Sequence, residues 1–181
     1  MHILALNGSP RKGGNTDLLL DEILTGAQSQ GHTIEKIPLY PLKILPCYDC
    51  RQCKKTPYVC PLKDDMHLLV ESMIKSDFII FGTPIYWYGP TAMMKLVVDR
   101  MRPFIANHQL SGKTGILVVP SEEGPSICDP LVKMFQMSFS YVGMAYGGAF
   151  LASAYEKGEI GKNLAEIQRA YEFGKGLKRG D

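Results

Sequence analysis

Four of the five cysteines in this chain of 181 residues lie close together in one segment. Two residues separate Cys47 from Cys50 and Cys50 from Cys53, and six residues separate Cys53 from Cys60. Three thiolates at two-residue spacing wrap readily around an iron-sulfur cube, and a fourth thiolate completes the ligand set. We therefore expect a [4Fe-4S] site at these four cysteines. Zinc held by all four thiolates, or free thiols or an adventitious disulfide, are the alternatives.

A second segment, residues 7–16, has the composition of an anion-binding loop. Its glycines allow backbone N–H groups to converge, and the residues after it begin a helix, whose amino end is positive. The side-chain donors of the segment are Ser9, Arg11, Asn15 and Thr16. This combination predicts a phosphate site. The alternative is a tight strand-to-helix turn that merely requires glycine.

The pattern of this loop restricts the phosphate that it can bind. Gly14 and Asn15 stand where a Walker A loop requires Lys and then Ser or Thr, and the glycines do not fit G-x-G-x-x-G. Ile37 and Pro38 end the second predicted strand, where a dinucleotide fold carries an acidic residue for the ribose. We therefore expect a terminal monophosphate rather than ATP or a dinucleotide.

Three aromatic residues, Tyr86, Trp87 and Tyr88, follow one another in a segment bounded by prolines and glycines. Their rings offer stacking area and the loop backbone offers N–H donors, so we expect a flat heteroaromatic ligand here. A dimer interface or a small separate core cluster is the alternative. The polar segment 120–125 is long enough to close over the edge of a bound ring, although a solvated turn is the simpler explanation of Glu122 and Glu123.

Short apolar runs alternate with longer amphipathic stretches along the chain. The runs predict strands at 3–6, 33–37, 78–81, 115–119 and 144–152, and the stretches predict helices at 17–28, 64–75, 91–102, 129–141 and 160–176. Continuous apolar strands between helices indicate a parallel sheet covered on both faces. Five strands favour the order 2-1-3-4-5, the flavodoxin-like three-layer α/β/α sandwich. Ligands bind such sheets at the carboxyl ends of the strands, where the loops described above begin.

The composition favours one globular domain and excludes several classes of partner. With 45% hydrophobic and 21% charged residues, we expect residues 1–181 to form one domain, with a cysteine-rich insertion at about 46–62. The net charge of +2 is spread along the chain, which does not suggest nucleic acid. The apolar runs are far shorter than the roughly 18 residues that cross a bilayer, and the start of the chain lacks the features of a signal peptide. We expect no membrane partner and a cytoplasmic protein.

Two of these segments, 7–16 and 83–90, are followed by Lys95 and the pair Asp99 and Arg100. Together they resemble the NADPH-dependent FMN reductase branch of the flavodoxin-like superfamily. With the cysteine insertion, they resemble iron-sulfur flavoproteins in particular. The resemblance covers roughly the first two-thirds of the chain, and residues 124–181 add only a compatible helix-strand-helix pattern.

The resemblance implies FMN bound without a covalent link. The residues implied at the phosphate are Ser9, Arg11, Asn15 and Thr16. Those implied at the isoalloxazine ring are Pro84, Ile85, Tyr86, Trp87 and Gly89, with Ser121 and Gly124 nearby. The flavin would carry the redox chemistry, so no catalytic acid is required. The resemblance also implies a homodimer or homotetramer.

These features lead to one leading hypothesis and two rivals. We expect an FMN-dependent oxidoreductase that transfers electrons between a small-molecule or protein donor and an acceptor, through FMN and a [4Fe-4S] cluster at Cys47, Cys50, Cys53 and Cys60. The first rival is an NAD(P)H-dependent FMN or quinone reductase without a cluster. The second is a flavin-binding or metal-binding module that regulates or docks a partner without catalysis.

Overall fold

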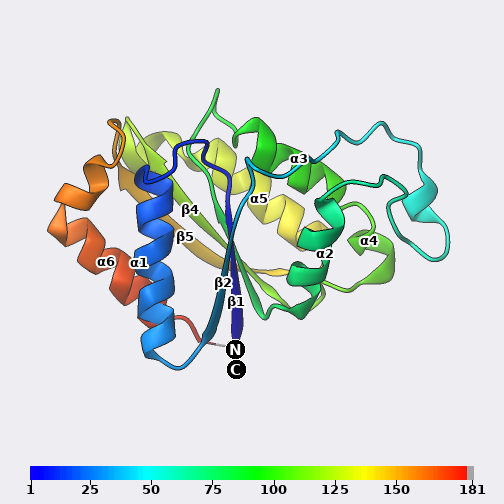
Figure 1. The fold of residues 1–181 in the computed structure, drawn as a ribbon, viewed down its shortest axis with the longest axis horizontal. Helices are drawn as coiled ribbons and strands as arrows, with labels where there is room; N and C mark the ends of the chain where they lie inside the picture. Colours follow the sequence, from blue (N-terminus) through cyan, green and yellow to red (C-terminus); the bar gives the residue numbers. More distant parts are fainter. Residues whose placement is uncertain (179–181) are drawn as a thin grey trace.

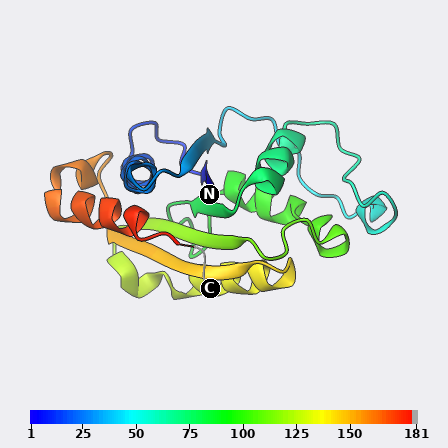
Figure 2. The same cartoon turned by 90° about the horizontal axis from the view of Figure 1, so that it is seen from below.

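The computed structural model describes residues 1–178 and contains a five-stranded parallel sheet between two layers of helices (Figures 1 and 2). The strands are β1 (His2–Asn7), β2 (Thr33–Pro38), β3 (Phe78–Gly82), β4 (Thr114–Ser121) and β5 (Ala145–Ser153). Their order is β2-β1-β3-β4-β5, and each neighbouring pair is parallel. The predicted fold class and strand order are therefore confirmed.

The helices agree with the sequence prediction except at two places. They are α1 (Asn15–Ser29), α2 (Met66–Lys75), α3 (Ala92–Arg100), α4 (Phe104–Asn107), α5 (Asp129–Tyr141) and α6 (Leu164–Lys175). The short α4 was not predicted, because one turn is too short to show a helical period. The predicted start of the last helix, at 160, is wrong: a 3-10 turn (Glu159–Lys162) comes first, and Asn163 caps α6 by accepting a hydrogen bond from the Glu166 N–H.

Two hydrophobic cores cover the two faces of the sheet, because successive strand residues point to opposite sides. Ile3 and Ala5 of β1 face α1 and α6, whereas Leu4 and Leu6 face α2, α3 and α5. On the second face, the rings of Phe81, Phe135 and Phe139 pack with centroids 5.0 to 5.6 Å apart. Within residues 1–178, none of the helices combines the length and hydropathy needed to cross a bilayer.

The helices α1 and α6 approach each other closely at two glycines. A Cβ atom on Gly174 would lie 1.8 Å from the carbonyl oxygen of Ile23, and one on Gly26 would lie 2.0 Å from the carbonyl oxygen of Tyr171. Neither contact involves a flexible side chain that could move aside. The two backbones are therefore in direct contact, and α1 is held rigidly against the sheet and α6.

One long irregular segment leaves this regular frame. Between β2 and α2 the chain forms only one 3-10 turn (Gln52–Lys54), and this segment contains the four clustered cysteines. In both overall views it extends from the end of the molecule beyond α2 and α4, away from α1 and α6 (Figures 1 and 2).

We predict that Gly174→Ala lowers the free energy of unfolding by about 2 to 3 kcal/mol, because the added methyl group would overlap the α1 backbone. The matched control is Gly176→Ala at the end of the same helix, where the nearest atom to an added Cβ is 3.4 Å away. Urea denaturation of both variants measures the effect. Equal stability of the two variants would contradict the close contact between α1 and α6.

Candidate functional site

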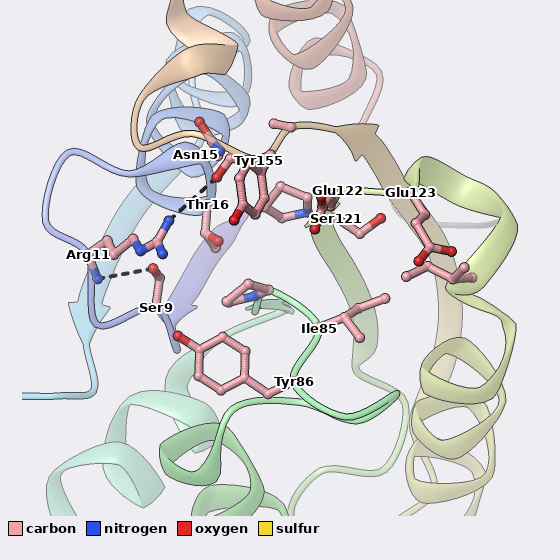
Figure 3. A pocket seen from close by; sticks show the side chains of 14 residues that line it. Ser9, Arg11, Asn15, Thr16, Ile85, Tyr86, Ser121, Glu122, Glu123 and Tyr155 are labelled. Atoms are coloured by element: carbon pink, nitrogen blue, oxygen red, sulfur yellow. Dashed lines mark hydrogen bonds between the residues drawn. The ribbon is translucent and has the colours of Figure 1, made fainter.

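A cleft of about 240 Å³ opens at the carboxyl ends of the strands (Figure 3). It is lined from the loops that follow β1, β3, β4 and β5. The predicted residues that line it are Ser9, Arg11, Asn15, Thr16, Pro84, Ile85, Tyr86 and Ser121. Trp87, Gly89 and Gly124 were also predicted at the site, but they lie outside the lining. The structure therefore brings the three predicted loops together with a fourth, the loop after β5.

The loop after β1 leads into the amino end of α1, which no side chain caps. The N-cap residue is Gly14. The first N–H groups of a helix have no partner within it and carry the positive end of its dipole. Side chains instead organise the loop behind them: Asn7 Oδ1 accepts from the Ser9 N–H at 3.0 Å, and Ser9 Oγ accepts from the Arg11 N–H at 3.2 Å.

Asp17 fixes this loop from the first turn of α1. Its carboxylate accepts hydrogen bonds from the Gly13 N–H at 2.8 Å, from Asn7 Nδ2 at 2.9 Å and from Lys36 Nζ at 2.8 Å. Burial by itself would raise the pKa of Asp17, but Lys36 and the other donors outweigh it and hold the pKa below its usual value. Asp17 is therefore an ionised part of the frame of the loop.

The loop after β5 forms one wall of the cleft and was missed from the sequence. Tyr155 lines the cleft, and its carbonyl oxygen lies 3.5 Å from Arg11 Nη1. The Asn15 side chain donates to the Glu156 carbonyl oxygen at 2.9 Å and accepts from the Ile160 N–H at 3.2 Å. The signal was available, because all carboxyl ends of a parallel sheet share one edge and an aromatic residue follows the fifth strand almost immediately.

The aromatic segment forms a tight hairpin turn rather than a flat platform. The Tyr86 N–H donates to the Gly89 carbonyl oxygen at 2.9 Å, and the Gly89 N–H donates back to Tyr86 at 3.1 Å. The two central residues, Trp87 and Tyr88, have φ angles of +50° and +61°, as in a type I′ turn. The Trp87 side chain is 96% exposed. Pro84, Ile85 and Tyr86 consequently face the cleft, while the turn carries Trp87 away from it.

The amino end of α3 ties the first two loops together. Thr91 Oγ1 donates to the Gly8 carbonyl oxygen at 2.6 Å, and the Thr91 N–H donates to Thr83 Oγ1 at 3.1 Å. Thr83 and Thr91 are both fully buried. A Cβ atom on Gly8 would lie 3.0 Å from the Met94 Cβ, so the loop passes very close to α3.

The loop after β4 folds back on itself at the third side of the cleft. Ser121 Oγ donates to the Gly124 carbonyl oxygen at 2.7 Å, so Gly124 shapes the loop from behind the lining. Glu122 and Glu123 line the cleft opposite Arg11 and Asn15 (Figure 3). The cleft thus has a cationic side at α1 and an acidic side at β4.

The four clustered cysteines line a second, much smaller cavity of about 30 Å³. All are free thiols, and Cys53 is the buried member. Burial and the neighbouring Cys60 raise the pKa of the Cys53 thiol, while Arg102 opposes them. Among residues 1–178, no three or more His, Cys, Asp or Glu side chains have the arrangement of a metal site. The four predicted ligands therefore line one cavity, but in residues 1–178 their side chains are not arranged as the ligands of a metal site.

We predict that Asp17→Asn destabilises the protein by about 1 to 3 kcal/mol at pH 7, because it removes the charge from three hydrogen bonds. A lowered folded pKa means that this stabilisation is present above the unfolded pKa of about 3.9 and is lost as the pH falls through the folded value. The difference from wild type should shrink below about pH 4 in urea denaturation. Asp99→Asn, which breaks an exposed pair with Lys95, is the control. A difference independent of pH would contradict the role of Asp17.

Known proteins are similar to this chain in sequence and in fold. The sequence model of the NADPH-dependent FMN reductase family matches residues 1–156. A Bacillus subtilis protein named as an NAD(P)H-dependent FMN-containing oxidoreductase is 29% identical over 100% of this chain and 99% of its own. An iron-sulfur flavoprotein of Methanocaldococcus jannaschii is 37% identical over 64% of this chain, a match that spans only 59% of that protein.

A solved structure adds the same result for the fold. The structure titled as the Trp repressor binding protein from Bacillus subtilis superposes with a TM-score of 0.72 at 28% identity, over 98% of this chain and 99% of that one. The matched residues 1–156 include the loops after β1, β3 and β4 and most of the loop after β5. This chain belongs to the NADPH-dependent FMN reductase family and is an oxidoreductase.

Proposed function

We propose that this protein binds FMN in the cleft at the carboxyl ends of the strands and transfers electrons between a small-molecule or protein donor and an acceptor. The observation that carries the proposal is the pairing of an uncapped helix end with an apolar and aromatic wall in one cleft. Membership of the FMN reductase family supports the choice of FMN. NAD(P)H is the donor that the name of the Bacillus subtilis relative suggests.

The cationic side of the cleft fits a terminal phosphate. The first N–H groups of α1 have no capping side chain, and Arg11 and Thr16 line the same side. A helix amino end with convergent N–H groups and a guanidinium is a suitable site for a dianion. The Asn15 amide is already bonded at both ends, so its role would be to hold the wall that carries Tyr155.

The rest of the cleft fits a planar ring. Ile85 and Tyr86 approach from one side and Tyr155 from another (Figure 3), and Pro84 also lines the cleft. Bound FMN would supply the hydride and electron chemistry, and the protein would supply orientation and hydrogen bonds to the ring. The loop backbone at Ile85 and the Ser121 hydroxyl oxygen, which can still accept a hydrogen bond, provide polar groups beside the apolar wall.

We further propose that the cysteine segment holds a [4Fe-4S] cluster, so that the protein has two redox centres. Cys47, Cys50, Cys53 and Cys60 line one cavity, and Arg51, Lys54 and Arg102 line it with them. Four thiolates are the usual ligand set of this cluster, and the basic side chains would offset its negative charge. The iron-sulfur flavoprotein from Methanocaldococcus jannaschii supports the same assignment.

The second candidate is an NAD(P)H-dependent FMN or quinone reductase without a cluster. Two observations favour it. The thiols of the described chain are not arranged as a metal site, and the relative that matches over nearly its whole length is named for FMN and NAD(P)H alone. In this case the four cysteines would remain thiols.

One experiment separates the two candidates. The protein would be purified without oxygen, its absorption spectrum recorded, and iron, zinc and released FMN assayed on the same sample. FMN with about four irons per chain supports the two-centre protein. Cys50→Ser should then lower the iron content, while Cys128→Ser, outside the cysteine cavity, should leave it unchanged. FMN without iron favours the second candidate, and absence of FMN would contradict both.

We predict that Arg11→Gln weakens FMN binding about 10-fold to 100-fold, because a charge-assisted hydrogen bond to the phosphate is lost. Binding of riboflavin, which lacks the phosphate, should stay the same in this variant. Lys12→Gln is the matched control, because Lys12 is adjacent but does not line the cleft. Fluorescence titration of the apoprotein measures both affinities. An equal loss of riboflavin binding would place Arg11 elsewhere than at the phosphate.

A further inference from the structure

Arg100 is a buried charged residue that the cleft does not use. It is the last residue of α3, and its side chain is 2% exposed. Its guanidinium donates to both carboxylate oxygens of Asp64, from Nη1 at 2.6 Å and from Nη2 at 3.2 Å, and Nη1 also donates to the Leu45 carbonyl oxygen at 2.8 Å. The Asp64 side chain of this ion pair is 0% exposed. A buried pair of this kind is stable only because its hydrogen bonds are so nearly complete.

These contacts hold the two ends of the cysteine segment together. Leu45 stands just before Cys47, and Asp64 stands just after Cys60. Asp64 also accepts hydrogen bonds from the Leu45 N–H at 2.8 Å and from the Met66 N–H at 3.1 Å. The segment that carries all four cysteines is therefore a loop whose base is closed by this ion pair. Beside it, the Asp65 N–H donates to the Lys43 carbonyl oxygen at 3.0 Å and the Lys43 N–H donates to Asp65 Oδ2 at 2.7 Å.

The same helix reaches the cleft at its other end. Thr91, the N-cap of α3, is bonded to Gly8 of the anion loop, while Arg100 ends the helix at the cysteine segment. A helix of nine residues is about 13 Å long. One rigid element thus fixes the base of the cysteine segment relative to the cleft.

One donor of Arg100 is left over. Within residues 1–178, Arg100 Nε is the buried side-chain nitrogen or oxygen that lacks a hydrogen-bond partner. Arg100 and Cys60 line the same apolar cavity of about 80 Å³. Burial disfavours the charge, but Asp64 and the Cys60 side chain outweigh it and raise the pKa of Arg100. Since buried N–H groups are normally paired, this donor is available to an acceptor in the cavity that Arg100 and Cys60 both line.

We propose that Arg100 is the positioning residue of the cysteine segment: it closes the base of the loop, and its free Nε–H donates to the Cys60 sulfur when the segment holds a cluster. The second part rests on the two-centre function proposed above, whereas the first part does not. A hydrogen bond to a ligating sulfur stabilises the reduced, more negative cluster and so raises its reduction potential.

The first test uses the metal-free protein and Arg100→Lys, which keeps the charge but loses the planar fork. Alkylation by iodoacetamide at fixed pH would be followed at each cysteine by mass spectrometry. We expect the alkylation rate of Cys60 to rise about tenfold or more. The variant loses hydrogen bonds of the Arg100 guanidinium to Asp64 and Leu45, and the base of the loop then opens more often. Cys128 is 0% exposed and outside the segment, so its rate reports general unfolding and should not change.

The matched control is Arg169→Lys, because Arg169 also pairs with a carboxylate and donates to a backbone carbonyl oxygen, but on α6. It should leave the Cys60 rate unchanged. If Arg100→Lys leaves the Cys60 rate within about twofold of wild type, the proposal is wrong. If Cys60 and Cys128 both become faster, the double variant Asp64→Leu with Arg100→Met decides, because an apolar replacement of a buried pair often preserves stability. In the double variant, slow alkylation of Cys128 together with fast alkylation of Cys60 supports the proposal. Slow alkylation of Cys60 overturns it.

The second test uses protein loaded with iron and sulfide. Arg100→Lys should lower the midpoint potential of the cluster and leave that of the flavin unchanged, which a merely structural role would not do. An unchanged cluster potential overturns the donation to Cys60. Wild-type protein that takes up no iron contradicts the proposed cluster, and with it the donation, while the alkylation test still decides whether Arg100 closes the loop.

Discussion

The site depends on the reversal of strand order at β1. The chain places β2 on one side of β1 and β3 on the other, and the helices that follow β1 and β3, α1 and α3, cover opposite faces of the sheet. The loops that follow β1 and β3 must therefore diverge, and side chains cannot fill the space between them. Because all strands are parallel, the loops after β4 and β5 reach the same edge and supply the remaining walls. The position of the cleft follows from the strand order, and the side chains and backbone groups that line it come from the loops.

The polar residues of these loops mostly hold backbone rather than face the cleft. Asp17 binds the Gly13 N–H, and Thr91 binds Gly8. Asn15, which lines the cleft, uses both ends of its amide to hold the loop after β5. The groups left for a ligand are backbone N–H groups at the start of α1, one guanidinium and an apolar wall. Under the proposed function, such a site would recognise a phosphate and a flat ring by shape and dipole, and the flavin would carry the chemistry without a buried catalytic acid.

Features that depend on local sequence patterns, such as the strands and the glycine-rich loop, could be predicted from the sequence. Features that depend on contacts between residues far apart in the chain could not. The apolar runs predicted the strands, and the number of strands favoured their order. The glycine-rich, aromatic and polar loops predicted three of the four walls of the cleft. The sequence predicted Trp87 at the ring of the cofactor, whereas the type I′ turn directs it away from the cleft. That turn was not foreseen, because its central residues are usually Asn and Gly rather than Trp and Tyr. Tyr155 was missed because only the loops after three strands were considered. The base of the cysteine segment was not predictable, since Asp64 and Arg100 are separated by 36 positions. Asp64 lies just before α2 and Arg100 ends α3, and no local pattern pairs one with the other.

The ion pair between Asp64 and Arg100 is hard to explain by stability alone. Removing two charges from water costs free energy that their attraction only just returns, and apolar residues of the same volume often serve as well or better. An apolar pair, however, could not bind the Leu45 carbonyl oxygen, the Leu45 N–H and the Met66 N–H at the same time. These directional bonds define where a loop without regular secondary structure begins and ends. The pair is therefore best understood as the contact that places the four cysteines, and its buried Nε–H is available to an acceptor in the cavity that Arg100 and Cys60 both line.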